Sequence, residues 1–190
     1  MGKLIVLISI TPDGFADGQN VMINPEFYDF IHELMSESDI IAFGRQTFEM
    51  FQERWPKRLI DNDSPEWVRK MAKSLNDMRK IVFSSTLKNT TWPNTVISDQ
   101  LMVDYIQELK RDNDKAILTF GSVSLIEKLT SMNMVDDYYF DLLPLLPGKG
   151  ETRFFKKLKL ETAQALKFVS SKNLPSGSHI IHYKNASFGE

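Results

Sequence analysis

The chain of 190 residues is 42% hydrophobic and 25% charged, with a formal net charge of -2. These values are close to those of average soluble globular proteins, and the length suits one domain with a large core. The two signs of charge are mixed and no basic stripe occurs, so a nucleic-acid partner is not expected. Cysteine is absent, which excludes disulfides, thiolate metal sites and a cysteine nucleophile.

The first apolar segment, Leu4–Ile10, follows Lys3 in the manner of a short signal peptide. It is shorter than the apolar region of such peptides, and Pro12-Asp13-Gly14 stands where a cleavage site of small residues belongs. No apolar run approaches the roughly 20 residues that a membrane span needs. We therefore expect a buried first strand, a cytoplasmic protein and no membrane partner.

Apolar segments of strand length alternate with amphipathic segments along the chain. Leu4–Ile10 and Ile40–Phe43 are apolar throughout, which is typical of central strands in a parallel sheet covered on both faces. The pattern predicts further strands at Lys80–Ser84, Thr95–Ile97, Ala116–Phe120, Asp137–Leu143, Leu166–Ser170 and His179–Tyr183.

Helix start signals fall between these strands. Asn24 before Pro25 predicts an N-cap followed by a proline at the first helical position, and Ser64 before Pro65 repeats the pattern. Further helices are expected at Leu101–Lys110 and Ser122–Ser131, the latter with an apolar face. After Ser131 the chain becomes rich in strands, and residues 173–178 read as the connection of a terminal hairpin. The sequence thus predicts one α/β domain spanning residues 1–190.

Three predicted strands end in small, hydroxylated or cationic residues. The second leads into Gly44, Arg45 and Thr47 and then a helix, the third into Ser84, Ser85 and Thr86, and the fifth into Gly121, Ser122 and Val123. Ligands of open α/β sheets bind at the carboxyl ends of strands, and helix N-termini there favour phosphate. Each end also has a structural interpretation as a turn, a polar loop or a helix cap. Together they favour a dinucleotide site.

The order of these segments resembles the dihydrofolate reductase-like family, in particular the branch with the reductase domain of bacterial riboflavin biosynthesis. The resemblance covers nearly the whole chain and is more specific for fold than for substrate. It is carried by Thr11–Ala16, Gly44–Glu49, Lys80–Leu87, Trp92–Asn94, Phe120–Ser122 with Leu125, Met134–Asp137 and Pro144–Phe155. It implies a three-layer α/β fold: a mixed, mostly parallel sheet with an antiparallel C-terminal edge hairpin and helices on both faces.

The resemblance also implies a reductase that uses NADPH. By position, Gly44, Arg45 and Thr47 would lie against the pyrophosphate, and Gly121, Ser122 and Val123 would meet it at a helix start. Ser84, Ser85 and Thr86 would surround the adenosine ribose and its 2′-phosphate. The loop from Asp13 to about Val21 would close over the nicotinamide.

One departure concerns the choice of cofactor. Many relatives carry a basic residue where Ser85 stands, and that cation helps to select the 2′-phosphate. NADH is therefore not excluded, unless Arg45, Arg79 or Lys88 supplies the missing charge.

Reduction of a C=O or C=N bond also needs a proton donor. Asp13 on the first loop is the candidate we favour, although Asp-Gly is equally a turn signal. Glu26, Asp29 and His32 are alternatives, with the two acids more typical of solvated helix positions. Five aromatic residues form either a flat pocket for a ring or part of the core: Phe15, Phe27, Phe48, Phe51 and Trp55.

Three functions remain open on the sequence. The first is hydride transfer to a small heterocyclic substrate, pteridine- or pyrimidine-like, or to a carbonyl compound. The second is a non-catalytic nucleotide-binding or interaction protein on the same fold. The third is a dihydrofolate reductase in the strict sense, which the sequence disfavours because the acid expected on the first helix is not evident.

The histidines do not form a metal-ligand pattern, so no metal is expected. Relatives often pair through their sheets, and Tyr138–Leu143 suits either a homodimer contact or a buried strand.

Overall fold

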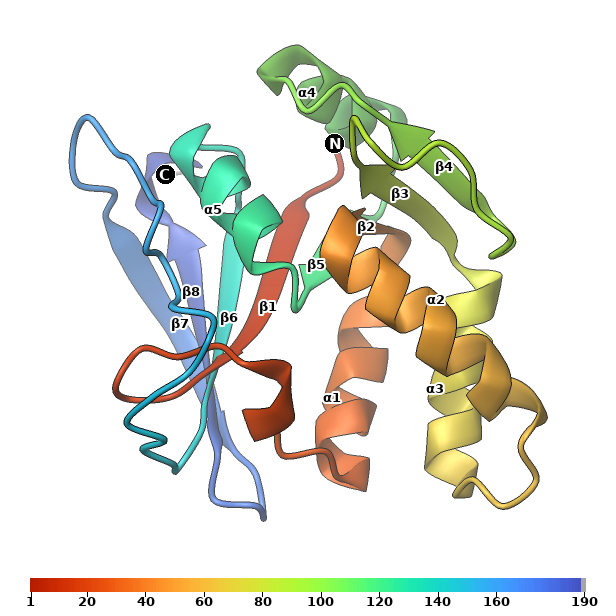
Figure 1. Cartoon of the computed structure of the whole chain (residues 1–190). Helices are drawn as coiled ribbons and strands as arrows, with labels where there is room; N and C mark the ends of the chain where they lie inside the picture. Colours follow the sequence, from red (N-terminus) through yellow and green to blue (C-terminus); the bar gives the residue numbers. More distant parts are fainter. Residues whose placement is uncertain (189–190) are drawn as a thin grey trace.

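The computed structural model describes residues 1–188, whose strands form one sheet (Figure 1). The strand order is β4-β3-β2-β5-β1-β6-β8-β7. The bounds are β1 Leu4–Ile10, β2 Ser38–Gly44, β3 Arg79–Phe83, β4 Thr95–Ser98, β5 Ala116–Phe120, β6 Asp137–Leu142, β7 Leu166–Asn173 and β8 His179–Asn185. The eight predicted strands are confirmed: β2, β4, β7 and β8 are longer than the sequence indicated, β3 is shifted by one residue, and β6 is shorter by one residue.

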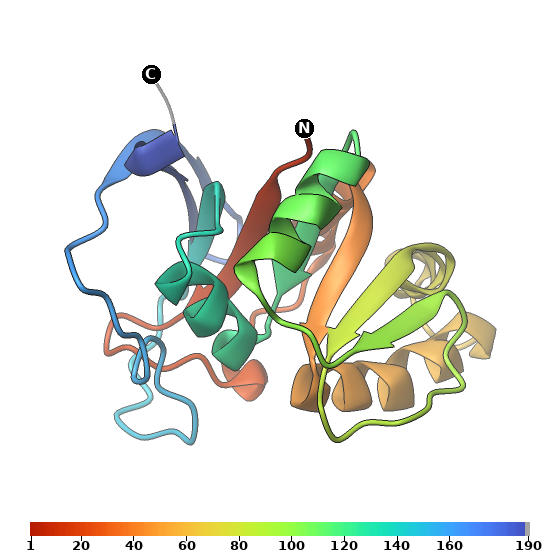
Figure 2. The same ribbon diagram turned by 90° about the horizontal axis from the view of Figure 1, so that it is seen from above.

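Neighbouring strands from β4 to β6 pair in parallel. β8 runs antiparallel to both β6 and β7, so the predicted C-terminal edge hairpin is confirmed. The view from above shows the strand direction turning across the sheet, as is usual for twisted sheets (Figure 2). The carboxyl ends of the parallel strands therefore lie on the same side of the sheet. We call this side the strand-end edge, and the candidate cofactor residues lie there.

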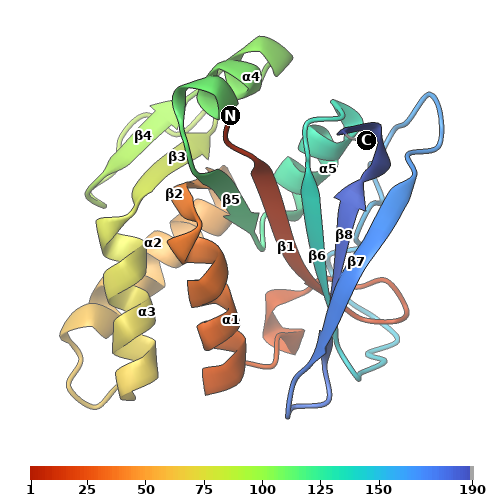
Figure 3. The same cartoon turned by 180° about the vertical axis from the view of Figure 1, so that it is seen from behind.

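Helices cover both faces of the sheet. α1 (Pro25–Ser36), α2 (Arg45–Ile60) and α3 (Glu66–Asp77) share one apolar core with alternate residues of the central strands. α4 (Val103–Asp112) and α5 (Val123–Ser131) share a second core with the opposite set. Seen from behind, α1 and α3 lie in front of the sheet, and α5 lies on its far side (Figure 3). The predicted three-layer arrangement is thus confirmed.

The helix starts follow the sequence signals in one case and not in the other. Asn24 caps α1, since its Oδ1 accepts a hydrogen bond from the Phe27 backbone N–H at 2.8 Å. Ser64 does not cap α3, so that prediction is wrong. Its hydroxyl donates to Asp61 Oδ2 at 2.7 Å, within the preceding turn, and the backbone carbonyl of Pro65 accepts the first helical hydrogen bonds.

β6 lies inside the sheet, between β1 and β8. Tyr138 and Leu143 are almost completely buried. Of the two interpretations of Tyr138–Leu143, the structure therefore supports the buried strand and not an exposed contact surface.

Candidate functional site

The C-terminal ends of β3, β2, β5 and β1 stand next to one another in that order. Residues 84–86 follow β3, residues 44–47 follow β2, and residues 121–123 follow β5. The loop of residues 11–24 follows β1 and contains the short helix η1 (Gly18–Asn20). Segments that are far apart in the sequence thus form one continuous edge.

Direct hydrogen bonds join the ends of β2 and β5. The Gly44 backbone N–H donates to Ser122 Oγ at 3.0 Å, and the Thr47 hydroxyl donates to the Gly121 carbonyl at 3.3 Å. Ser122 is buried, so its side chain ties the two strand ends together instead of facing outward. Only the backbone of Ser122 is left to contact a ligand.

The two glycines at this junction differ in what requires them. Gly121 has a φ of +69°, which a residue with a side chain adopts only with strain. Gly44 has an ordinary φ of -81°. A Cβ at Gly44 would make only van der Waals contacts, at 3.7 Å from Leu125 and two serine hydroxyls. Backbone conformation therefore requires glycine at 121, whereas position 44 tolerates a small side chain.

The helices that start at this junction lack a side-chain cap. Within residues 1–188, no side chain of the N-cap residue bonds to the first turn of α2 or of α5, in contrast to Asn24 on α1. Their first-turn N–H groups and the positive end of the helix dipole favour an anion. Arg45, the first residue of α2, is half exposed and forms an ion pair with Glu49 at 2.8 Å. A phosphate at this place would compete with that carboxylate for the guanidinium.

The hydroxyl run after β3 forms a tight turn. Ser84 Oγ accepts hydrogen bonds from the backbone N–H groups of Thr86 and Leu87, and Ser85 and Thr86 are exposed. Lys88 Nζ donates to the Ser85 carbonyl at 2.9 Å. Arg79 begins β3, at the opposite end of the strand. Of the three cations considered from the sequence, Lys88 therefore lies nearest to Ser85.

Two carboxylates bind the first loop to the loop after β6. Asp13 Oδ2 accepts a hydrogen bond from the Gly148 N–H at 2.9 Å, and its Oδ1 accepts one from the Thr11 hydroxyl at 2.6 Å. Asp17 Oδ1 accepts from the N–H groups of Glu151 and Thr152, both at 3.0 Å. The two loops thus form one unit beside the end of β1.

The surroundings of the four candidate proton donors decide whether each carries a proton at neutral pH. The hydrogen bond from Thr11 is the main cause that lowers the pKa of the partly exposed Asp13 carboxyl, which favours the ionised form. Glu26 and Asp29 are exposed on α1. Partial burial lowers the pKa of His32, which favours a neutral ring. Each of the four groups considered from the sequence is thus exposed or held in a form without a proton to give at neutral pH.

Most of the aromatic residues proposed for a pocket lie in the core instead. Phe15, Phe27, Phe48 and Phe51 are buried. Phe48 and Phe51 contact Phe43, a residue of β2. Their helical spacing on α2 placed them against the sheet, as the core interpretation requires.

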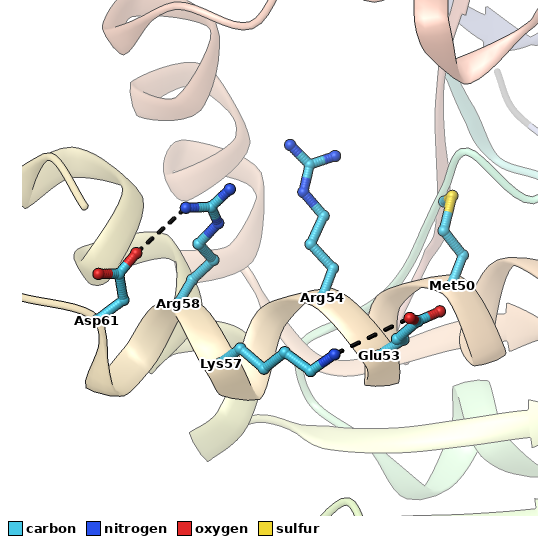
Figure 4. A pocket seen from close by; sticks show the side chains of 6 residues that line it. All are labelled: Met50, Glu53, Arg54, Lys57, Arg58 and Asp61. Carbon is cyan, nitrogen blue, oxygen red and sulfur yellow. Dashed lines mark hydrogen bonds and ion pairs between the residues drawn. The ribbon is translucent and has the colours of Figure 1, made fainter. Parts of the chain in front are cut away.

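Two cavities lie along α2, away from the strand ends. One, of about 470 Å³, is lined by Met50, Glu53, Arg54, Lys57, Arg58 and Asp61 (Figure 4). The other, of about 170 Å³, shares Arg54 and Arg58 and adds Tyr28, Trp55 and Trp67 among its walls. Arg58 is paired with Asp61 at 3.2 Å. The candidate cofactor residues line neither cavity.

Several buried polar atoms close to the C-terminal ends of the strands have no protein partner. Among residues 1–188 they are Asp17 Oδ2 and Asn20 Nδ2 on the first loop, Thr119 Oγ1 on β5 and Asp141 Oδ1 on β6, with Thr119 and Asp141 on opposite faces of the sheet. A ligand rich in hydroxyl, amide and phosphate groups, such as a nicotinamide dinucleotide, fits an edge of this kind. Asp141 was not predicted from the sequence as a site residue, although an acid with apolar residues on both sides was a visible signal.

Comparisons with known proteins agree with this geometry. The model of the RibD C-terminal domain matches residues 3–180. The chain belongs to the RibD C-terminal domain family. A curated relative in Bacillus subtilis (strain 168), the uncharacterized protein YyaP, is 26% identical over 188 residues, which cover 95% of this chain and 94% of YyaP.

Solved structures share the fold of this RibD C-terminal domain. A putative riboflavin biosynthesis protein from Shewanella sp. PV-4 is 20% identical, with a TM-score of 0.66 over 97% of this chain and 99% of the other. A pyrimidine reductase-like protein from Corynebacterium diphtheriae is 14% identical, with a TM-score of 0.65 over 97% and 92%. At these identities the likeness establishes the fold, and family membership supports a reductase-like role. No helix of residues 1–188 is long and apolar enough to cross a membrane.

Proposed function

We propose that the protein is an NADPH-dependent reductase that acts on a small heterocyclic substrate, pteridine- or pyrimidine-like, or on a carbonyl compound. The observation that carries the proposal is the order of strand ends, β3, β2, β5 and β1. The parts of an extended dinucleotide follow one another in the same order, from the adenosine ribose through the pyrophosphate to the nicotinamide.

Each group of residues would contact a different part of the cofactor, according to its position on the sheet. Ser84, Ser85 and Thr86 would hold the ribose and its 2′-phosphate. Gly44, Arg45 and Thr47 would contact the pyrophosphate together with the backbone of Gly121, Ser122 and Val123, at two helix starts without a side-chain cap. The loop that carries Asp13 would cover the nicotinamide and keep water out. The reduced nicotinamide, when bound, supplies a hydride.

The alternative function is nucleotide binding or protein interaction without catalysis. It differs from the reductase in one measurable respect, because a binding protein would take up the cofactor without oxidising it. Strict dihydrofolate reductase activity is less favoured, since both acids in the first two turns of α1, Glu26 and Asp29, are exposed.

We also propose that the protein forms a homodimer in the cytoplasm. β7 is exposed along its whole length and carries Leu166, Phe168 and Val169 at the surface. An edge strand with these side chains favours pairing with a second copy.

The test of the proposed function is thermal stabilisation by NADPH and by NADH. At a cofactor concentration one hundred times the dissociation constant, binding adds about 2.7 kcal/mol of stability. Arg45→Ala removes a guanidinium that would contact phosphate, and we expect it to weaken NADPH binding roughly tenfold or more. An unchanged melting temperature with either cofactor would contradict the proposal.

Two further variants make the result specific. Glu49→Gln releases Arg45 from its ion pair, and we expect NADPH binding to be kept or strengthened. Arg111→Ala removes an exposed cation of α4, whose partner Asp112 is also on the surface, and we expect it to bind as the wild type does. Equal losses in Arg45→Ala and Arg111→Ala would indicate general charge attraction and not a site.

A further inference from the structure

Asp141 is a buried acid at the carboxyl end of β6. It pairs in register with Ser9 of β1 and with Ile180 of β8, and only 1% of its surface is exposed. One residue further on, β6 ends, and the loop begins that bonds to Asp13 and Asp17. Asp141 therefore lies where both loops of the candidate site leave the sheet.

Side-chain alternation places Asp141 on the face that α1 covers. Tyr139, two residues earlier on β6, packs against Phe30 of α1 with ring centroids 5.6 Å apart. Ile180, directly opposite on β8, belongs to the same core. Residues two apart on a strand share a face, so Asp141 faces the space between the sheet and α1, one strand beyond β1.

The two carboxyl oxygens of Asp141 have different surroundings. Oδ2 accepts a hydrogen bond from the Ser9 hydroxyl at 2.6 Å. Oδ1 is buried and has no hydrogen-bond partner among the described residues. An unpartnered buried carboxyl oxygen costs free energy, and a substrate nitrogen or oxygen at this place would relieve that cost.

We propose that Asp141 is the acid that gives a proton to the substrate of the reductase. This inference rests on the proposed function, and it replaces the favoured role of Asp13. Asp13 is partly exposed and bonds to the Gly148 N–H and the Thr11 hydroxyl, both of which stabilise its ionised form. Asp141 has one oxygen held and one free, on the strand next to the expected nicotinamide end.

The protonation of Asp141 supports this assignment. Burial raises the pKa of its carboxyl, and the nearby Ser9 and Ser178 hydroxyls oppose that rise. Among the described residues, no charged group contributes to the shift: β1 presents Ser9, the turn before β8 presents Ser178, and β8 presents Ile180. Tyr139 is the nearest titratable group on β6 itself, and burial raises its pKa to about 12, so it stays neutral.

The chemical step balances with groups already named. The hydride that the cofactor supplies reaches the carbon of a C=N or C=O bond. The Asp141 O–H bond breaks, its proton forms a new bond to the nitrogen or oxygen, and the substrate is reduced by two electrons. The carboxylate that remains is stabilised by the Ser9 hydroxyl, which donates to Oδ2, until water returns a proton.

The first experiment follows Asp141 without any ligand. Protein labelled with carbon-13 at the aspartate carboxyls is titrated by NMR, and the Asp141 signal is identified by its loss in Asp141→Asn. We expect its midpoint to lie above that of the other aspartates, and Ser9→Ala, which removes the donor to Oδ2, to raise it further. A midpoint in the ordinary range for aspartate would overturn the proposal.

The second experiment uses 2,4-diaminopyrimidine as a basic heterocyclic probe. We expect the ultraviolet spectrum of the protonated ring when the probe binds the wild type, and no protonated ring with Asp141→Asn. Glu26→Gln removes an exposed acid of α1 and should behave as the wild type. A wild type that does not protonate the probe, or an equal spectrum with Asp141→Asn, would also overturn the proposal.

The pH dependence of protein stability tests the same assignment without a substrate. A carboxyl with a raised pKa in the folded state keeps its proton at pH values where the unfolded chain has lost it. Stability should therefore fall as pH rises from the ordinary pKa of an aspartate, about 3.9, through the raised pKa of Asp141, and Asp141→Asn should remove this slope. A slope that persists in Asp141→Asn belongs to another group and would count against the assignment.

Cofactor binding separates the two proposals. If NADPH stabilises both the wild type and Asp141→Asn but the probe is not protonated, the role of Asp141 fails and the reductase proposal stands. If NADPH stabilises neither protein, the proposed function fails, and with it the catalytic role of Asp141.

Discussion

Single residues decide which cofactor the strand-end edge would prefer. Ser85 carries no charge, but Lys88 reaches back and donates to the Ser85 carbonyl at 2.9 Å. Its ammonium group is thus held beside the place proposed for the 2′-phosphate. A charge supplied from three residues further along the chain can serve the same purpose as one at position 85.

We expect Lys88→Ala to weaken NADPH binding and to leave NADH binding unchanged. A hydrogen bond to a charged group contributes about 1.5–3 kcal/mol, so the loss in affinity should be roughly tenfold or more. Calorimetric titration with both cofactors measures the ratio. Arg79→Ala is the matched control, because Arg79 lies at the opposite end of β3 and should affect neither cofactor. Parallel losses for NADPH and NADH would show that Lys88 does not read the 2′-phosphate.

At the scale of elements, the loop after β1 and the loop after β6 are held together by hydrogen bonds from backbone N–H groups to carboxyl side chains. Asp17 alone accepts two N–H groups from the loop after β6. Phe15 forms a bridge with Arg153 in the same pair of loops. The close approach leaves no room for a side chain at Gly150, whose Cβ would lie 2.1 Å from Asp17 Oδ2.

We expect Asp17→Ala to loosen both loops while the sheet stays intact. Two partly buried N–H groups would lose their acceptor, and since water can replace it in part, the cost should stay below about 1–3 kcal/mol each. Amide hydrogen exchange should become faster at Glu151 and Thr152 and stay slow in β1 and β5. Asp17→Asn keeps one carbonyl oxygen in place and should exchange nearly as the wild type does. Unchanged exchange in Asp17→Ala would show that other contacts hold the loops.

At the scale of the whole molecule, the sheet has two unequal edges. β4 is short, whereas β7 presents eight exposed residues, Phe168 among them with 58% of its surface exposed. An edge of this kind promotes pairing between chains unless it is covered.

We expect Phe168→Glu to shift the protein from dimer to monomer, because a charge at a pairing edge opposes close contact between two copies. Light scattering combined with size-exclusion chromatography measures the mass over a series of protein concentrations. Met102→Glu adds the same charge at an exposed position that precedes α4, and should leave the mass unchanged. A monomeric wild type would exclude the proposed homodimer.

Some features of the molecule could be predicted from the sequence because they depend on local chemistry. Apolar runs of strand length gave the eight strands, and Asn24 before Pro25 gave the start of α1. The helix cap predicted at Ser64 was wrong, because a serine hydroxyl can either cap a helix or close a turn. Here the hydroxyl bonds to Asp61, three residues earlier, and closes the turn. The single-domain boundary of residues 1–190 and the roles of the candidate site residues stay predictions.

Lys80 shows what sequence pattern does not reveal. A lysine in a strand usually marks an exposed position, yet Lys80 is completely buried. Its Nζ donates to the carbonyls of Leu75, Asn76 and Met78 around the end of α3, and burial lowers its pKa to about 8. These acceptors are carbonyls of the last turn of α3 and of its C-cap residue, which the turn into β3 brings around the lysine.

The sequence by itself determined the elements, their order and the family resemblance, because strand periodicity, helix caps and glycine turns act within a few residues. The tertiary structure alone decided which strand ends are neighbours, that Ser122 joins two strands, and that Asp141 has an unpartnered oxygen. These facts depend on strand order and on contacts between residues far apart in the chain, such as Ser9 and Asp141. Burial and charge follow from those contacts, so the chemistry of the site became visible only in the folded molecule.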